Sequence, residues 1–353
     1  MNQVKAFPLN RRSFMRNGLL AGGAAIASAD LLNTTAIRAQ TPNKPTDGDI
    51  AILRFLAAAE LIEADLWQQY NELGGVNNNG ITNSYINAFK NLDDDGPKYI
   101  TGNTNDEISH AAFLNAYIES KGGDPVDFDS FRTLQGSMAT GAQNIGRLTN
   151  LGHLNVDTSW YTRYRSTKNP DFGDTFPQAL TITNRQSIPL TDADFNDPKH
   201  IQVIADIAAF HFGTIEQAGS SLYSALSQKV TSPEVLEITI GILGSEVAHY
   251  LEWVDFAGSA VEKASISDGG TTIPDFEGNE NLDPDTIFPV ACEFINKKLP
   301  HCAVVRPLST QFGGAQAATQ GLIAMNLFQG QPKRFTNQLM KLAVAADAAT
   351  RSI

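Results

Sequence analysis

The sequence predicts an all-α protein: a four-helix bundle with a long crossover between helices 2 and 3 and a C-terminal loop and helix appendage. One observation is the tetrapeptide Glu-x-x-His, which occurs twice, at residues 107–110 and 246–249. The other is that an earlier helical segment precedes each copy and carries a glutamate seven residues before a tyrosine. These pairs are Glu63 with Tyr70 and Glu216 with Tyr223. Residues three or seven apart share one face of an α-helix, so the chain repeats one pattern over four helices.

The first bundle helix is predicted over residues 47–73, where apolar residues recur at helical spacing and two glycines follow. Glu60 and Glu63 both lie in its apolar stripe, where carboxylates are uncommon. We choose Glu63 as the ligand because its spacing to Tyr70 is repeated at Glu216 and Tyr223. Glu60 is left either as a residue that supports a ligand or as one at the edge of the buried face.

The other bundle helices are predicted from their caps and apolar spacing, at residues 103–120, 198–226 and 233–262. The bundle therefore covers residues 48–262, with a crossover at 124–197 that includes a helix over 131–148. A connection of this length is required if the second and third helices run parallel. Shorter helices are predicted at residues 83–92 and, within the appendage 265–353, at 333–350.

Residues 1–39 have the features of a targeting segment. The run Asn10-Arg11-Arg12-Ser13-Phe14-Met15-Arg16 precedes a weakly apolar stretch rich in Ala and Gly, which resembles a twin-arginine export signal. We therefore expect export by the twin-arginine pathway to the periplasm or the extracellular space, with no membrane span after the signal is removed.

The charge of the chain excludes one class of partner. The whole sequence has a formal net charge of -12, and residues 1–39 carry five basic side chains and one acidic one, so the remainder carries -16. A surface this acidic repels phosphate backbones and anionic lipid, so we expect no nucleic-acid binding. A homo-oligomer is left open.

The two cysteines, Cys292 and Cys302, lie ten residues apart in a Pro-rich segment. In an exported protein a disulfide that closes this short loop is the favoured interpretation. Two buried thiols are the alternative.

The repeated pattern predicts a metal site. Four glutamates and two histidines supplied by four helices are the ligand set of a carboxylate-bridged dimetal centre in a helix bundle. The candidate metal ligands are Glu63, Glu107, His110, Glu216, Glu246 and His249. Two Fe or two Mn ions would suit them equally, because both metals accept carboxylate and imidazole ligands. Glu and His pairs on solvated helix faces are the alternative.

The same residues resemble the ferritin-like superfamily, which includes rubrerythrins, bacterioferritins and manganese catalases. The exported form with a long crossover is similar to the desiccation-related branch of that superfamily. The resemblance covers about residues 48–262 and does not extend to 265–353. It implies a left-handed bundle with a di-iron or dimanganese centre, in which Glu107 and Glu246 bridge the ions. Glu63 and Glu216 would then be terminal ligands, and His110 and His249 would bind one ion each.

Such a centre suggests an oxidoreductase that acts on H₂O₂ or O₂ in stress protection, of the catalase, peroxidase or metal-oxidase type. Tyr70 and Tyr223 are the candidates for a supporting catalytic role, either as hydrogen-bond donors to terminal carboxylates or in electron transfer. Simple packing in the bundle is their alternative role. The second function hypothesis is a non-catalytic metal-binding or structural stress protein, so whether the chain is an enzyme is left open.

Overall fold

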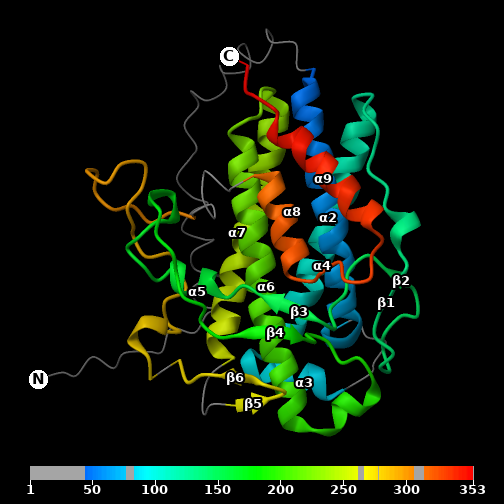
Figure 1. The fold of residues 1–353 in the computed structure, drawn as a ribbon, viewed down its shortest axis with the longest axis vertical. Helices are drawn as coiled ribbons and strands as arrows, with labels where there is room; N and C mark the ends of the chain where they lie inside the picture. The colour runs from blue at the N-terminus through cyan, green and yellow to red at the C-terminus, as the bar shows by residue number, and fades with distance from the viewer. Residues whose placement is uncertain (1–43, 77–82, 261–265, 277, 306–313, 353) are drawn as a thin grey trace, which may run out of the picture. The chain divides into compact units, whose positions relative to one another are not determined.

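The computed structural model describes residues 44–76, 83–260, 266–276, 278–305 and 314–352 (Figure 1). The predicted export segment, residues 1–39, lies outside the described residues. In the described part, eight α-helices dominate and the strands form only two-stranded sheets, which confirms the all-α prediction. None of the helices described is both long enough and apolar enough to cross a bilayer.

The four bundle helices are α2 (Asp47–Gly74), α4 (Gly96–Ser120), α6 (Pro198–Ser227) and α7 (Pro233–Ser259). Thr46 and Asp49 form a capping box at the start of α2, and Asp197 caps α6 just before Pro198. Helix α4 starts seven residues before its predicted beginning. The short helix predicted at residues 83–92 is α3 (Ser84–Leu92), which Asn83 caps.

Contacts at the helix ends define the directions of the bundle. The Asp49 carboxylate in the first turn of α2 accepts hydrogen bonds from the backbone N–H groups of Thr231 and Ser232, just before α7. Lys121, just after α4, pairs with Glu234 in the first turn of α7 at 2.9 Å. The starts of α2 and α7 and the end of α4 therefore lie together. Helices α4 and α6 run parallel, as the long crossover requires, and this part of the prediction is confirmed.

Helices α2 and α6 are buried on nearly all sides, because the crossover and the appendage cover what the other bundle helices leave free. In the appendage, α9 (Lys333–Asp347) packs along α2, and α8 (Ala315–Ala324) packs against α9 and α6 (Figure 1). The crossover strands β3 (Leu154–Val156) and β4 (Ile182–Arg185) pair antiparallel beside α6. Helices α4 and α7 keep an outer face toward solvent, with apolar side chains such as Phe113 and Ile240 about half exposed.

The crossover contains no helix over residues 131–148, so that prediction is wrong. A 3-10 turn at Asp129–Phe131 leads into a small antiparallel pair, β1 (Leu134–Gln135) and β2 (Gly146–Arg147). Glycines explain the difference. Gly141 has a φ of 111°, which helices do not use. At Gly146 in β2 the segment leading into the paired strand passes so close that a Cβ would lie 1.9 Å from the Arg132 carbonyl oxygen. The rest of the crossover holds α5 (Ser159–Arg163) and 3-10 turns at Pro170–Phe172 and Asp192–Asn196.

A buried carboxylate attaches the crossover to α2. Asp65 is fully buried and accepts hydrogen bonds from the backbone N–H groups of Leu148 and Thr149. Its other oxygen pairs with the guanidinium of Arg132 at 2.7 Å. These partners satisfy a charge that would otherwise be costly to bury.

The appendage adds a hairpin, β5 (Ile266–Asp268) with β6 (Thr271–Ile273), and a 3-10 turn at Glu280–Leu282 before α8 and α9. Cys292 and Cys302 lie opposite each other in an isolated antiparallel bridge, joined by two backbone hydrogen bonds of 3.1 and 2.9 Å. The disulfide between them stays a prediction. The helix predicted at 333–350 is α9, while α8 was not predicted.

Candidate metal centre

Two groups of ligand-type side chains meet in the middle of the bundle. The first consists of Glu60, Glu107, His110 and Glu246, and the second of Glu107, Glu216 and His249. Within each group, one ligand atom from every residue lies within 4.8 Å of the others. The four bundle helices all contribute, and Glu107 belongs to both groups.

The distances show how Glu107 connects the two groups. His110 Nδ1 lies 3.2 Å from Glu107 Oε2, 3.4 Å from Glu60 Oε2 and 3.8 Å from Glu246 Oε1. His249 Nδ1 lies 3.2 Å from Glu107 Oε1 and 3.3 Å from Glu216 Oε2. The two oxygens of one carboxylate therefore face the two imidazoles separately, and the ring centroids are 6.4 Å apart.

Helical spacing and burial produce this geometry. Each Glu-x-x-His pair spans three positions of one helix, so carboxylate and imidazole point to the same side. The carboxylates of Glu107, Glu216 and Glu246 have no exposed surface, whereas the two histidine side chains are 12% exposed. The imidazoles, carried by α4 and α7, therefore form the side of the centre nearest to solvent.

Buried hydrogen-bond donors orient the carboxylates across the bundle. The indole Nε1–H of Trp67 on α2 donates to Glu216 Oε1 on α6 at 3.0 Å. In the opposite direction, the hydroxyl of Tyr223 on α6 donates to Glu60 Oε1 on α2. In both glutamates the other oxygen, Oε2, faces an imidazole: His110 for Glu60 and His249 for Glu216. Hydrogen bonds of this kind orient the side chains that bind a metal.

A second set of contacts holds Glu107 and His249. The Asn103 amide nitrogen donates to Glu107 Oε1 at 2.9 Å and to Glu216 Oε1 at 3.1 Å. The indole of Trp253 holds that amide in place at 2.8 Å. His249 Nε2 lies 3.0 Å from Asp106 Oδ2 and can donate its hydrogen there, which leaves Nδ1 as the nitrogen that would bind a metal.

Without a metal ion, several of the buried glutamates in the centre hold a proton. Burial raises the pKa of Glu246 and Glu216, and burial with the Glu107 charge raises the pKa of Glu60 to about 8. Glu107 differs, because its close contacts with both histidines outweigh its burial and hold its pKa low. Burial alone would lower the pKa of His110, but contacts with Glu107 and Glu60 raise it to about 10. A divalent cation would displace these protons.

Comparison with known protein families agrees with this geometry. The model of the ferritin-like domain family matches residues 48–253, which include all four bundle helices up to Trp253 and every residue of both groups. The chain belongs to the ferritin-like family. The searches of curated proteins and of solved structures gave no match for this ferritin-like chain.

The residues present fit a pair of metal ions. Five buried polar atoms of the centre have no hydrogen-bond partner among the described residues. They are Glu60 Oε2, Glu216 Oε2, Glu246 Oε1 and Oε2, and His249 Nδ1. Buried acceptors without donors are rare and costly, and five in one place favour a cation. Carboxylate oxygen and imidazole nitrogen together suit Fe and Mn. At Gly219, a Cβ would lie 2.1 Å from Glu246 Oε2, so only glycine leaves that carboxylate its room.

The structure differs from the sequence analysis in the ligand from α2. Glu60, and not Glu63, belongs to the first group. Glu63 lies close by, since the charges of Glu107 and Glu60 add to burial in raising its pKa. The signal for Glu60 was present in the sequence. Trp67 follows Glu60 by seven residues as Tyr223 follows Glu216, and these two aromatics donate reciprocally across the bundle.

The two candidate tyrosines have different surroundings. Tyr223 contacts the centre through Glu60. The Tyr70 hydroxyl instead meets Ser187 Oγ at 2.6 Å and His211 Nδ1 at 2.7 Å, away from the metal-ligand groups. Sequence reasoning also did not identify the donors Trp67, Asn103 and Trp253, because nothing in the local pattern shows which residues of one helix face another.

Proposed function

We propose that this ferritin-like protein binds two Fe or two Mn ions and reduces or disproportionates H₂O₂, or reduces O₂, as an exported stress-protection protein. The observation that carries the proposal is a single buried carboxylate, Glu107, shared by two Glu/His groups whose remaining lone pairs lack donors. Bound ions of either metal supply this chemistry by alternating between the +2 and +3 states.

The chain's own residues would divide the work as follows. Glu60, His110 and Glu246 would hold one ion and Glu216 with His249 the other, with Glu107 between them. Four ligand carboxylates nearly balance the charge of two divalent ions, which reduces the cost of burying that charge. The crossed donors described above would keep the carboxylates aimed at the ions during turnover.

The space beside the centre supports a small oxidant as the substrate. A cavity of about 30 Å³ lies next to Glu63 and Gly219, and its other walls are mostly apolar. One water molecule needs roughly 10–15 Å³ of such volume, so this space can hold a molecule as small as O₂ or H₂O₂ but not an organic substrate. The export part of the proposal is supported by the paired Arg11-Arg12 and the Ala/Gly-rich stretch after them.

Metal analysis tests this proposal. We expect about two Fe or Mn ions per chain in the purified protein, and their loss in a Glu107→Ala, Glu246→Ala double variant that keeps its helical circular dichroism. Glu237→Ala, an exposed glutamate on the same helix as Glu246, is the matched control and should keep both ions. Oxygen release or peroxide consumption by the loaded protein then tests the reaction.

The two outcomes separate the hypotheses. Failure to bind either metal after loading with both would overturn the dimetal centre. Two bound ions without any consumption of H₂O₂ or O₂ would instead favour the non-catalytic metal-binding or structural function.

A further inference from the structure

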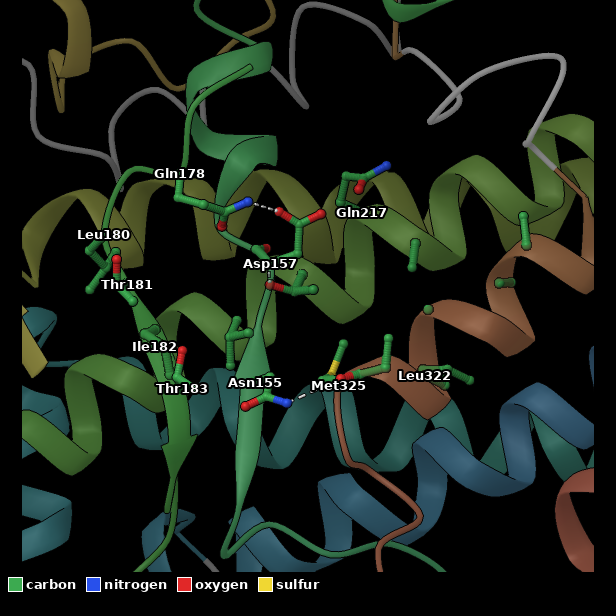
Figure 2. A pocket seen from close by; sticks show the side chains of 17 residues that line it. Asn155, Asp157, Gln178, Leu180, Thr181, Ile182, Thr183, Gln217, Leu322 and Met325 are labelled. Atoms are coloured by element: carbon green, nitrogen blue, oxygen red, sulfur yellow. Dashed lines mark hydrogen bonds between the residues drawn. The ribbon is translucent and has the colours of Figure 1, made fainter. Parts of the chain in front are cut away.

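A larger cavity lies on the other side of α6, outside the metal centre. It has a volume of about 410 Å³, is partly open to solvent, and is lined by residues of β3, β4, α6 and α8 and of the segments next to them (Figure 2). Small-molecule sites in proteins commonly have volumes of roughly 300–1,000 Å³, so this cavity has the size of one. Figure 2 shows side chains of the strands, Asn155 and Thr183 among them, on the side of the space opposite Leu322 of α8 and Met325, which directly follows α8.

The walls determine which ligands would fit. Leu180, Ile182, Leu322 and Met325 provide apolar contact together with Val156 and several alanines, and amide and hydroxyl side chains are set among them. Among the described residues that line the cavity, Asp157 has the one ionisable side chain. Although burial opposes it, hydrogen bonds from Ser159 and Gln178 lower the pKa of Asp157, so it stays anionic. Such a cavity repels anions and suits a neutral ring with hydroxyl groups that can donate to a carboxylate.

Met325 connects this cavity to a buried imidazole. His211 has no exposed surface, and its Nε2 lies 3.2 Å from Met325 Sδ. A thioether sulfur can only accept a hydrogen bond, so Nε2 carries the hydrogen and Nδ1 is left as an acceptor. Tyr70 therefore donates its hydroxyl hydrogen to Nδ1, at 2.7 Å. Burial lowers the pKa of His211 to about 3, which keeps the resting imidazole neutral.

Tyr70 continues the path toward the metal ligands. Its ring centroid lies 5.8 Å from that of Trp67, and both rings are fully buried. The Trp67 indole donates to Glu216 at 3.0 Å, as described above. An unbroken series of contacts, through Met325, His211, Tyr70 and Trp67, thus joins the wall of the larger cavity to a metal ligand. Tyrosine and tryptophan are the side chains in this series that can be oxidised and reduced by one electron.

We propose that the larger cavity binds a neutral hydroquinone-type reductant and that Tyr70 and Trp67 carry its electrons to the metal centre, with His211 holding the proton of Tyr70. The inference rests on the proposed peroxide chemistry. It also explains why an electron path is needed, because the cavity beside Glu63, at about 30 Å³, is too small for an aromatic ring to approach the ions.

The chemistry balances in two one-electron rounds. In each round Tyr70 gives one electron through Trp67 to the centre and its phenolic proton to His211 Nδ1, leaving a neutral tyrosyl radical beside an imidazolium. The hydroquinone then returns one electron to Tyr70 and releases one proton to solvent past Asp157, while the proton on Nδ1 returns to the Tyr70 oxygen. Two rounds convert the hydroquinone to the quinone and deliver two electrons. With two protons from solvent, these electrons reduce one H₂O₂ to two H₂O.

Binding is tested first on the metal-free protein, so that its result does not depend on the peroxide reaction. Calorimetric titration with hydroquinone should show saturable binding that Ala318→Trp, which fills the cavity, weakens about tenfold or more. Ile323→Trp on the exposed face of the same helix is the matched control and should bind like the wild type. Asp157→Asn adds no volume, and it should admit para-hydroxybenzoate, which the wild type should reject. Absence of saturable hydroquinone binding by the wild type would overturn the cavity assignment.

The electron path is tested on the metal-loaded protein. Freeze-quench electron paramagnetic resonance after H₂O₂ addition should show a tyrosyl radical in the wild type and in Tyr85→Phe, another fully buried tyrosine, but not in Tyr70→Phe. Oxidation of hydroquinone by Tyr70→Phe should fall about tenfold or more at equal metal content. An unchanged radical signal and rate in Tyr70→Phe would overturn the path. If the loaded wild type consumes no H₂O₂ at all, the proposed function fails together with the path, whereas the calorimetry still decides the cavity.

Discussion

The choice between two glutamates on one helix is the sharpest test of the metal centre. Glu60 and Glu63 lie three residues apart on α2, yet only Glu60 belongs to a ligand group. We expect Glu60→Gln to lose the ion on the His110 side and Glu63→Gln to keep both ions. Gln is a suitable replacement because the pKa of Glu60, raised by burial to about 8, leaves the metal-free carboxyl mostly protonated at pH 7. The metal-free variant should therefore fold at least as stably as the wild type at pH 7, because Gln needs no proton to be buried there.

The size of the effect follows from the position of Glu60. Its Oε2 lies 3.4 Å from His110 Nδ1 without a hydrogen-bond donor, and its Oε1 is held by Tyr223. Loss of residues that merely support ligands costs about 10–100-fold in metal affinity, so loss of a ligand should cost about 100-fold or more. At a free metal concentration of about 100 times the wild-type Kd, binding stabilises the wild type by about 2.7 kcal/mol, and the variant by only about 0.4 kcal/mol.

Metal titration followed by thermal unfolding measures this difference, and elemental analysis gives the number of ions retained. Glu63→Gln serves as the matched control, because it makes the same chemical change one helical turn away. If Glu63→Gln loses an ion while Glu60→Gln keeps both, the ligand from α2 is Glu63 and the geometry described above is not the geometry of the loaded centre.

Three further outcomes are expected. Gly219→Ala should lose the metal, because the added Cβ would lie 2.1 Å from Glu246 Oε2. Gly244→Ala on α7 is the control and should keep the metal, because a Cβ there meets nothing within 4 Å. Elemental analysis of the two variants measures the difference. Trp67→Phe removes the donor to Glu216 and should weaken metal binding about 10–100-fold, as measured with a competing chelator. The metal-free protein should lose stability as the pH rises from about 4.5 to about 8, at about 1.4 kcal/mol per pH unit for Glu60, because the folded state keeps a proton that the unfolded chain has released. Urea unfolding at several pH values, with Glu60→Gln as comparison, checks the slope, and stability that rises over this range would contradict the assigned proton.

The Glu-x-x-His ligands of the centre could be predicted from the sequence, because their arrangement depends on local helix geometry. Glu-x-x-His places both side chains on one helix face wherever that helix packs, so Glu107, His110, Glu246 and His249 could be proposed together. The bundle helices followed in the same way from caps, proline starts and apolar spacing, all of which act within a few residues.

Other features needed contacts between distant segments. Glu60 and Glu63 share an apolar stripe, and only the rotation of α2 against α6 decides which of them meets His110. The helix expected at residues 131–148 is absent because Gly141 takes a left-handed backbone conformation and Gly146 lies in a strand that pairs closely with residues 134–135. The larger cavity exists only where strands of the crossover meet α8, about 140 residues later in the chain.

The sequence by itself determined the four bundle helices, their order and the chemical types of the metal ligands, because helical periodicity and capping are short-range properties of the chain. Tertiary structure decided which glutamate of α2 joins the centre, which donors orient each carboxylate, and that Tyr70 lies between the metal ligands and a cavity. The reason is physical: those relations depend on how neighbouring helices rotate and pack against one another, and packing is set by the sum of contacts over the whole core.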